Sequence, residues 1–85
     1  MIPGLITAKH VEAALAEAHR AGVPKHRESV LWDVVHNGER HPPKYIISLA
    51  YRLATGDMLD PALFDSGEAR TRLRALGYTV EPKAQ

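Results

Sequence analysis

Residues 29–55 read SVLWDVVHNGERHPPKYIISLAYRLAT, and this stretch predicts a β-hairpin followed by a helix. Its first part, SVLWDVV (29–35), is rich in residues that favour extended structure and predicts a strand. The dipeptide Asn37-Gly38 follows closely, and both positions of a tight hairpin turn require the positive φ that Asn and Gly tolerate. ERH (39–41) is therefore the predicted return strand of a β-hairpin.

A helix is predicted directly after the hairpin. Pro42-Pro43 ends the return strand, and Pro43 suits the first position of a helix, where the missing N–H costs nothing. The helix should run from Lys44 to about Thr55, with Gly56 as its stop. Its predicted buried face consists of Ile46, Leu49, Ala50 and Leu53.

The N-terminal part of the chain predicts a capped amphipathic helix. Thr7 is the expected cap, AKHVEAALAEAHRA (8–21) the helix and Gly22 its stop. Residues 1–6 are expected to be frayed. The apolar face of this helix consists of Val11, Leu15 and Ala18.

The C-terminal part predicts a turn region, a third helix and a last strand. DMLDPALF (57–64) is the turn region, Asp65 or Ser66 caps the helix, and Gly77 ends it. YTVEP (78–82) alternates as a half-buried strand does and should pair with the hairpin, and residues 83–85 should fray. The side chains expected in the core are Leu59, Leu63, Phe64, Leu73 and Leu76.

These elements predict a single α+β domain over residues 1–85, in which three helices pack on a short antiparallel sheet in the order α-β-β-α-α-β. The chain of 85 residues is 45% hydrophobic and 25% charged, as in an ordinary globular domain. It has no cysteine, which excludes disulfides and thiolate metal sites. The sequence contains neither a membrane span nor a signal peptide, so we expect a cytoplasmic protein.

The formal net charge of +1 is too small to indicate nucleic-acid binding by itself. The distribution of charge is more informative, because the middle of the chain is basic and rich in histidine. Acidic residues collect later, between Asp57 and Glu68. The basic residues of the middle segment are Arg20, Lys25, Arg27, Arg40, Lys44 and Arg52.

The segment PKHRESVLW (24–32) combines cations, a hydroxyl and an indole, a mixture that suits phosphate contact and base stacking. Lys25 and Arg27 are candidate phosphate ligands because nothing in a core could use them. Ser29 and Trp32 complete the candidate set. The alternative is a solvated loop with Trp32 in the core, as is usual for a lone Trp in a small domain.

The segment GERHPPKYIISLA (38–50) places Arg40, His41 and Lys44 around a helix N-terminus, which attracts anions. Tyr45 is either a core residue or a hydrogen-bond donor to a phosphate. Alternatively, the prolines only set the turn while Lys44 stays in solvent. A third basic group, Arg70, Arg72 and Arg74, is more typical of a solvated helix face.

Catalytic and metal-binding interpretations find little support. His36-Asn37 could belong to an HNH nuclease centre, but Asn37 is explained by the turn and further metal-binding residues at suitable spacing are missing. His36 and His41 across the hairpin are too few ligands for a functional metal site. The sequence contains no Walker loop, no G-x-S-x-G and no paired carboxylates. We therefore expect no catalytic residue, no metal and no cofactor.

Five motifs together carry a resemblance to a known family. The sequence resembles the N-terminal head domain of McrA-like modification-dependent HNH endonucleases, the Streptomyces type whose other domains recognise phosphorothioated and methylated DNA. The motifs are T-x-x-H-V-x-x-A-L (7–15), V-P-K-x-R-E-S (23–29), N-G-x-x-H-P-P-K-Y-I-I-S-L-A (37–50), T-G-x-x-L-x-P-x-x-F (55–64) and L-x-x-L-G-Y (73–78). The sequence departs from this family at His41, where we expect Tyr, and at residues 65–67, where we expect a Gly-rich cap.

The resemblance implies a double-stranded DNA-binding accessory domain of a type IV restriction endonuclease that serves in phage defence. The nuclease chemistry would lie in another domain of the parent protein. The other domains of that protein would be partners of this one, and any homodimer would form through the parent protein. The alternative is a protein-interaction or dimerisation module, and an enzyme in its own right ranks third.

Overall fold

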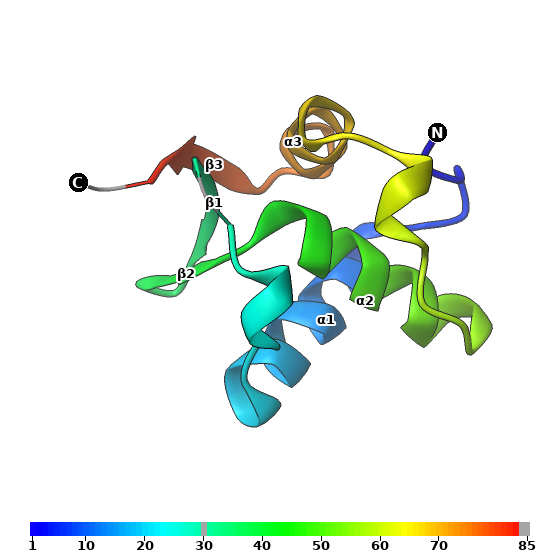
Figure 1. Cartoon of the computed structure of the whole chain (residues 1–85), viewed down its shortest axis with the longest axis horizontal. Coiled ribbons are helices and arrows are strands. Elements are labelled where there is room, and N and C mark those ends of the chain that lie inside the picture. Colours follow the sequence, from blue (N-terminus) through cyan, green and yellow to red (C-terminus); the bar gives the residue numbers. More distant parts are fainter. Residues whose placement is uncertain (30, 84–85) are drawn as a thin grey trace.

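The computed structural model describes residues 1–29 and 31–83. These residues form three α-helices and a three-stranded antiparallel sheet in the order α-β-β-α-α-β, which confirms the predicted α+β fold. The sheet lies beside the helices (Figure 1). The elements are α1 (Ala8–Ala21), the 3-10 helix η1 (Lys25–Arg27), β1 (Trp32–His36), β2 (Glu39–His41), α2 (Pro43–Thr55), the 3-10 helix η2 (Pro61–Leu63), α3 (Ser66–Ala75) and β3 (Thr79–Pro82).

The sheet has the strand order β2-β1-β3, with both pairs antiparallel. The hairpin turn is confirmed, since Asn37 and Gly38 have φ values of 51° and 78°. β1 begins at Trp32 rather than at residue 29. The reason is that the Ser29 hydroxyl donates to Asp33 at 2.8 Å, while η1 turns the chain just before it.

α1 begins and ends as the sequence predicts. The Thr7 hydroxyl accepts from the His10 N–H, and the Thr7 N–H donates to the His10 ring at 3.1 Å, which closes a capping box. Gly22 ends the helix at a φ of 80°. The buried face of α1 consists of Val11, Ala14, Leu15 and Ala18, at helical spacing.

α2 is the central helix, packed between α1 and α3 (Figure 1). Residues 45–50 are all buried, so this part of the helix has no solvent-exposed face. The predicted burial of Leu53 is wrong, because its side chain is 45% exposed. Burial on α2 stops at Ala50, so its last turn extends beyond the elements that cover the first half.

The segment after α2 fills one side of the core from a loop. Leu59 and Phe64 are buried as predicted, but Leu63 is 57% exposed. The Asp60 carboxylate accepts from the Ala62 N–H and caps η2, and this tight turn directs Leu63 outward. Asp65 then caps α3, whose Ala69 and Leu73 are buried.

The N-terminal residues are not frayed, so that expectation is wrong. Ile2 and Ile6 lie in the core, with 5% and 3% of their surface exposed. The Arg72 guanidinium holds the segment further by donating to the carbonyls of Pro3 at 2.7 Å and Ile2 at 3.1 Å. The side chains of Ile2 and Ile6 thus complete a core that the helices alone leave open.

The C-terminal strand is tied to the segment before β1. The Lys83 N–H donates to the Leu31 carbonyl at 2.7 Å, and Lys83 Nζ donates to the Ser29 carbonyl at 2.9 Å. Lys83 is therefore held in place, while residues 84 and 85 of the predicted frayed end lie outside the described residues. Across residues 1–29 and 31–83, no helix is both long and apolar enough to cross a membrane.

Candidate functional site

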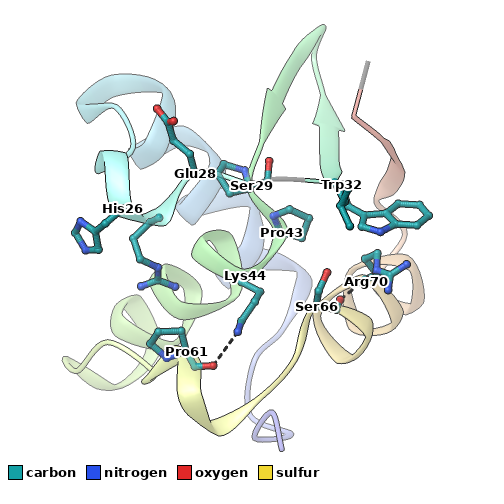
Figure 2. Close-up of a pocket in the computed structure, with 12 residues that line it drawn as sticks. His26, Glu28, Ser29, Trp32, Pro43, Lys44, Pro61, Ser66 and Arg70 are labelled. Carbon is teal, nitrogen blue, oxygen red and sulfur yellow. Dashed lines mark hydrogen bonds between the residues drawn. The ribbon is translucent and has the colours of Figure 1, made fainter. Parts of the chain in front are cut away.

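A cleft of about 500 Å³ lies where the first residues of α2 and α3 meet η1, η2 and the start of β1. Figure 2 shows His26 on one side of it, Trp32 and Arg70 on the other, and Lys44 between them. The lining residues are His26, Arg27, Glu28, Ser29, Leu31, Trp32, Pro42, Pro43, Lys44, Pro61, Ser66 and Arg70. Four of the predicted site residues, Arg27, Ser29, Trp32 and Lys44, therefore share one concave surface.

Arg27 is anchored in the molecule rather than free in solvent. Its guanidinium donates to the buried Ser48 hydroxyl at 3.0 Å and lies over the Tyr45 ring, 5.3 Å from the centroid. Ser48 in turn donates to the Leu59 carbonyl at 2.8 Å. The expectation that nothing in the core uses Arg27 is wrong, since a buried hydroxyl on α2 is its acceptor.

Partial burial affects the charge of Arg27 as well as its position. Desolvation lowers the pKa of the Arg27 guanidinium, and Tyr45 and Asp60 oppose that shift. An arginine remains protonated at neutral pH even so. Arg27 therefore presents a fixed positive charge with limited conformational freedom at the edge of the cleft.

Lys44 crosses the cleft from the first turn of α2. Its Nζ donates to the Pro61 carbonyl at 2.8 Å (Figure 2) and lies 5.0 Å from the centroid of the Phe64 ring. No side chain caps the start of α2, where Pro42 occupies the N-cap position. The positive end of this helix and the Lys44 ammonium therefore both contribute positive electrostatic potential on the same side of the cleft.

Trp32 and α3 form the opposite wall. The Arg70 guanidinium lies 4.1 Å from the Trp32 ring centroid, and that of Arg74 lies 5.7 Å away. Arg70 Nε also donates to the Ser66 carbonyl at 3.3 Å, and Arg74 donates to the Val80 carbonyl at 3.0 Å. Trp32 is half-buried and packs against the core with part of its surface in the cleft.

The arginines of α3 are thus not the solvated face that their sequence suggests. Arg70 and Arg74 cover Trp32, and Arg72 binds the N-terminal segment. The sequence alone did not predict that Arg70 lines the cleft. The sequence feature that could have indicated it is the single Trp at the start of a strand. Once α3 and β3 pack beside this Trp, its ring requires side chains that pack against it.

Arg40 lies on the other face of the sheet, over a second, shallower cleft that Ser29 also lines. It pairs with Asp33 at 3.4 Å and with Glu81 at 2.9 Å, across the three strands. Asp33 is buried and also accepts from Ser29. The charge of Arg40 is therefore largely balanced inside the domain.

Three further predicted residues lie outside the lining of the main cleft. Lys25 is exposed on η1 and does not line it. His41 and Tyr45 are buried, with 7% and 9% of their surface exposed. Burial lowers the pKa of His41, and the Glu39 carboxylate, 3.9 Å from its ring nitrogen, opposes that shift.

The main cleft carries an excess of positive charge. Arg27, Lys44 and Arg70 line it together with His26, and Glu28 is the acidic residue among the lining side chains. In the part of the chain that the structure describes, no group of three or more His, Cys, Asp or Glu side chains could hold a metal ion. The cleft can therefore bind an anion through its cations and through the uncapped positive end of α2, whereas the Asp65 carboxylate already caps α3.

Comparison with known proteins identifies a family for nearly the whole chain. The family described as ScoMcrA-like, N-terminal head domain matches residues 4–82, nearly the whole chain. The chain matched none of the curated proteins and none of the solved structures with which it was compared. From the extent of the family match, this chain belongs to the ScoMcrA-like N-terminal head domain family.

Proposed function

We propose that this domain is a non-catalytic module that binds double-stranded DNA, mainly through the phosphate backbone, for a McrA-like restriction protein. The observation that carries the proposal is the cleft in which Arg27, Lys44 and Arg70 surround the first turns of α2 and α3. Backbone phosphates are the anions that such cations and helix ends bind in DNA complexes.

The side chains keep donors for a phosphate beyond those used inside the domain. A guanidinium has five N–H donors, and the contact with Ser48 uses one nitrogen of Arg27. Arg70 binds the Ser66 carbonyl through Nε, so its terminal nitrogens can serve the cleft. Lys44 has three donors, one of which is directed at Pro61.

Residues beside the cleft extend the proposed footprint. Lys25 is exposed on the same 3-10 helix as Arg27 and suits a phosphate on the neighbouring nucleotide. Ser29 and Trp32 border the cleft directly. Tyr45 acts from beneath by holding the Arg27 guanidinium, and Arg40 and His41 contribute to the fold more than to the DNA contact.

Family membership supports the context of the proposal. In a parent restriction endonuclease of modification-dependent type, the cleavage chemistry would belong to a separate domain, with the head domain and that domain as partners in one cytoplasmic protein. Such a protein needs to bind DNA independently of its base sequence, and contacts with the phosphate backbone provide this kind of binding.

Fluorescence anisotropy with a labelled duplex tests the proposal on the 85-residue chain. Because each neutralised phosphate releases counterions, we expect affinity to fall steeply from low to moderate salt, with a slope of about 0.9 per phosphate contact. An absence of binding even at low salt would exclude the proposed function. Light scattering on the same samples reports whether the chain associates with itself instead.

A further inference from the structure

The cleft has more apolar surface than a phosphate contact requires. Leu31, Trp32 and three prolines line it, and Leu31 is 68% exposed although it is large and hydrophobic. Phosphate oxygens gain nothing from such a wall, because they bind through charge and N–H donors. Such a lining suits an occupant that has both an anionic part and an apolar part.

We propose that the cleft takes up one unpaired, unstacked nucleotide of the bound DNA, with its base against Leu31 and the Trp32–Arg70 wall and its phosphate at Arg27 and Lys44. This inference rests on the proposed DNA-binding function and names the part of the DNA that the cleft holds. The positive charge of the lining, against the single carboxylate of Glu28, favours a nucleotide over an uncharged apolar ligand.

The geometry of the wall suits a base. Arg70 lies 4.1 Å from the Trp32 ring centroid, so the pair forms one edge of the cleft (Figure 2). Aromatic rings and guanidinium planes are the surfaces on which proteins stack unpaired bases. The cleft volume of about 500 Å³ is within the range of sites that bind small organic ligands.

A consequence follows for the form of DNA that binds best. In a perfect duplex the base must first leave the stack, whereas an extrahelical nucleotide has already lost its pairing. The domain should therefore prefer a duplex with one extrahelical nucleotide over the same duplex without it. The preference should depend on the apolar wall and not on the number of phosphate contacts.

The test compares two duplexes that are identical except that one carries an additional, extrahelical 2-aminopurine nucleotide. We expect the duplex with the extrahelical nucleotide to bind about tenfold more tightly, equivalent to ~1.4 kcal/mol. Stacking in the cleft should also quench the emission of 2-aminopurine. Leu31→Asn should remove both the preference for the extrahelical nucleotide and the quenching.

A matched control uses Leu53→Asn, since Leu53 is also exposed but lies on the last turn of α2, outside the cleft. This variant should keep both the preference and the quenching. Equal binding of the two duplexes without quenching would overturn the inference and leave the DNA-binding function standing. No binding of either duplex would overturn both, so the two failures are distinguishable.

Discussion

The guanidinium of Arg70 on α3 lies 4.1 Å from the ring centroid of Trp32 on β1, so one cation–π contact joins the third helix to the sheet and forms a wall of the cleft. Arg74 approaches the same ring at 5.7 Å. Arg70 therefore both joins α3 to the sheet and lines the candidate binding cleft.

Replacing Arg70 tests this contact directly. Arg70→Ala should lower the free energy of unfolding by about 1 kcal/mol, because a half-buried cation–π contact and its packing are lost. Trp32 is the only Trp in the chain, so its emission should shift to longer wavelength as the ring gains solvent. Urea unfolding and emission spectra measure both effects. Unchanged stability and an unchanged spectrum would contradict the assigned contact.

The hairpin turn depends on Gly38. Its φ of 78° is strained for any residue with a Cβ, although a Cβ there would meet no atom within 4 Å. Gly38→Val should therefore destabilise the domain by about 1 kcal/mol or more through backbone strain alone. Gly38→Asn should cost less, because Asn tolerates this region. Thermal melting compares the variants, and equal melting temperatures of the Val variant and the wild type would refute the turn assignment.

Arg27 should contribute to the stability of the domain as well as to DNA binding, and the contribution to stability can be measured by itself. Arg27→Ala leaves the buried Ser48 hydroxyl without its guanidinium donor and should lower the free energy of unfolding by about 1 kcal/mol. Arg52→Ala is the matched control, because Arg52 is exposed on the last turn of α2. Chemical denaturation of the two variants gives the comparison. Equal stability of both would contradict the anchored position of Arg27.

The fold and the site differ in how far the sequence predicts them. The turn at Asn37-Gly38 and the helix start at Pro43 are local features, fixed by φ preferences of single residues, and both are confirmed. The burial of Ile2 could not be predicted, because it depends on the space that the helices leave between them. Arg72 was equally hidden, since its acceptors lie about 70 residues away in the chain.

The candidate site follows the same division. The residue types were recognisable, but the sequence does not reveal which cations are already paired within the domain. Arg40 and Arg27 look alike in sequence, yet Arg40 is balanced by Asp33 and Glu81, whereas Arg27 faces the cleft with donors to spare. Only the tertiary arrangement separates the two.

Stability should fall in mild acid because of His41. Burial lowers the pKa of His41 in the folded state below its ordinary value of 6.5, so the unfolded chain takes up the proton first. This contribution to stability is present above pH 6.5 and is lost as the pH falls from there toward the lower pKa of the folded state. Glu39 and Asp33 oppose the shift, while His19 and His36 add to it.

Urea unfolding at pH 7.5 and at pH 5 measures this dependence. His41→Gln should reduce the loss of stability between the two values, because the group that takes up the proton is gone. His26→Gln, at an exposed histidine, should keep the wild-type loss. An identical loss in the wild type and in His41→Gln would show that another group is responsible.

We expect phosphates of duplex DNA to bind in the cleft where α2 and α3 begin. The most direct measurement is the salt dependence of duplex affinity for the wild type, Lys44→Ala and Arg52→Ala, which remove one positive charge each, inside and outside the cleft. We expect Lys44→Ala to weaken binding and to lower the slope of log affinity against log salt by about one, whereas Arg52→Ala should bind as the wild type does. Equal binding by folded Lys44→Ala and wild type, or a larger loss in Arg52→Ala, would contradict this expectation.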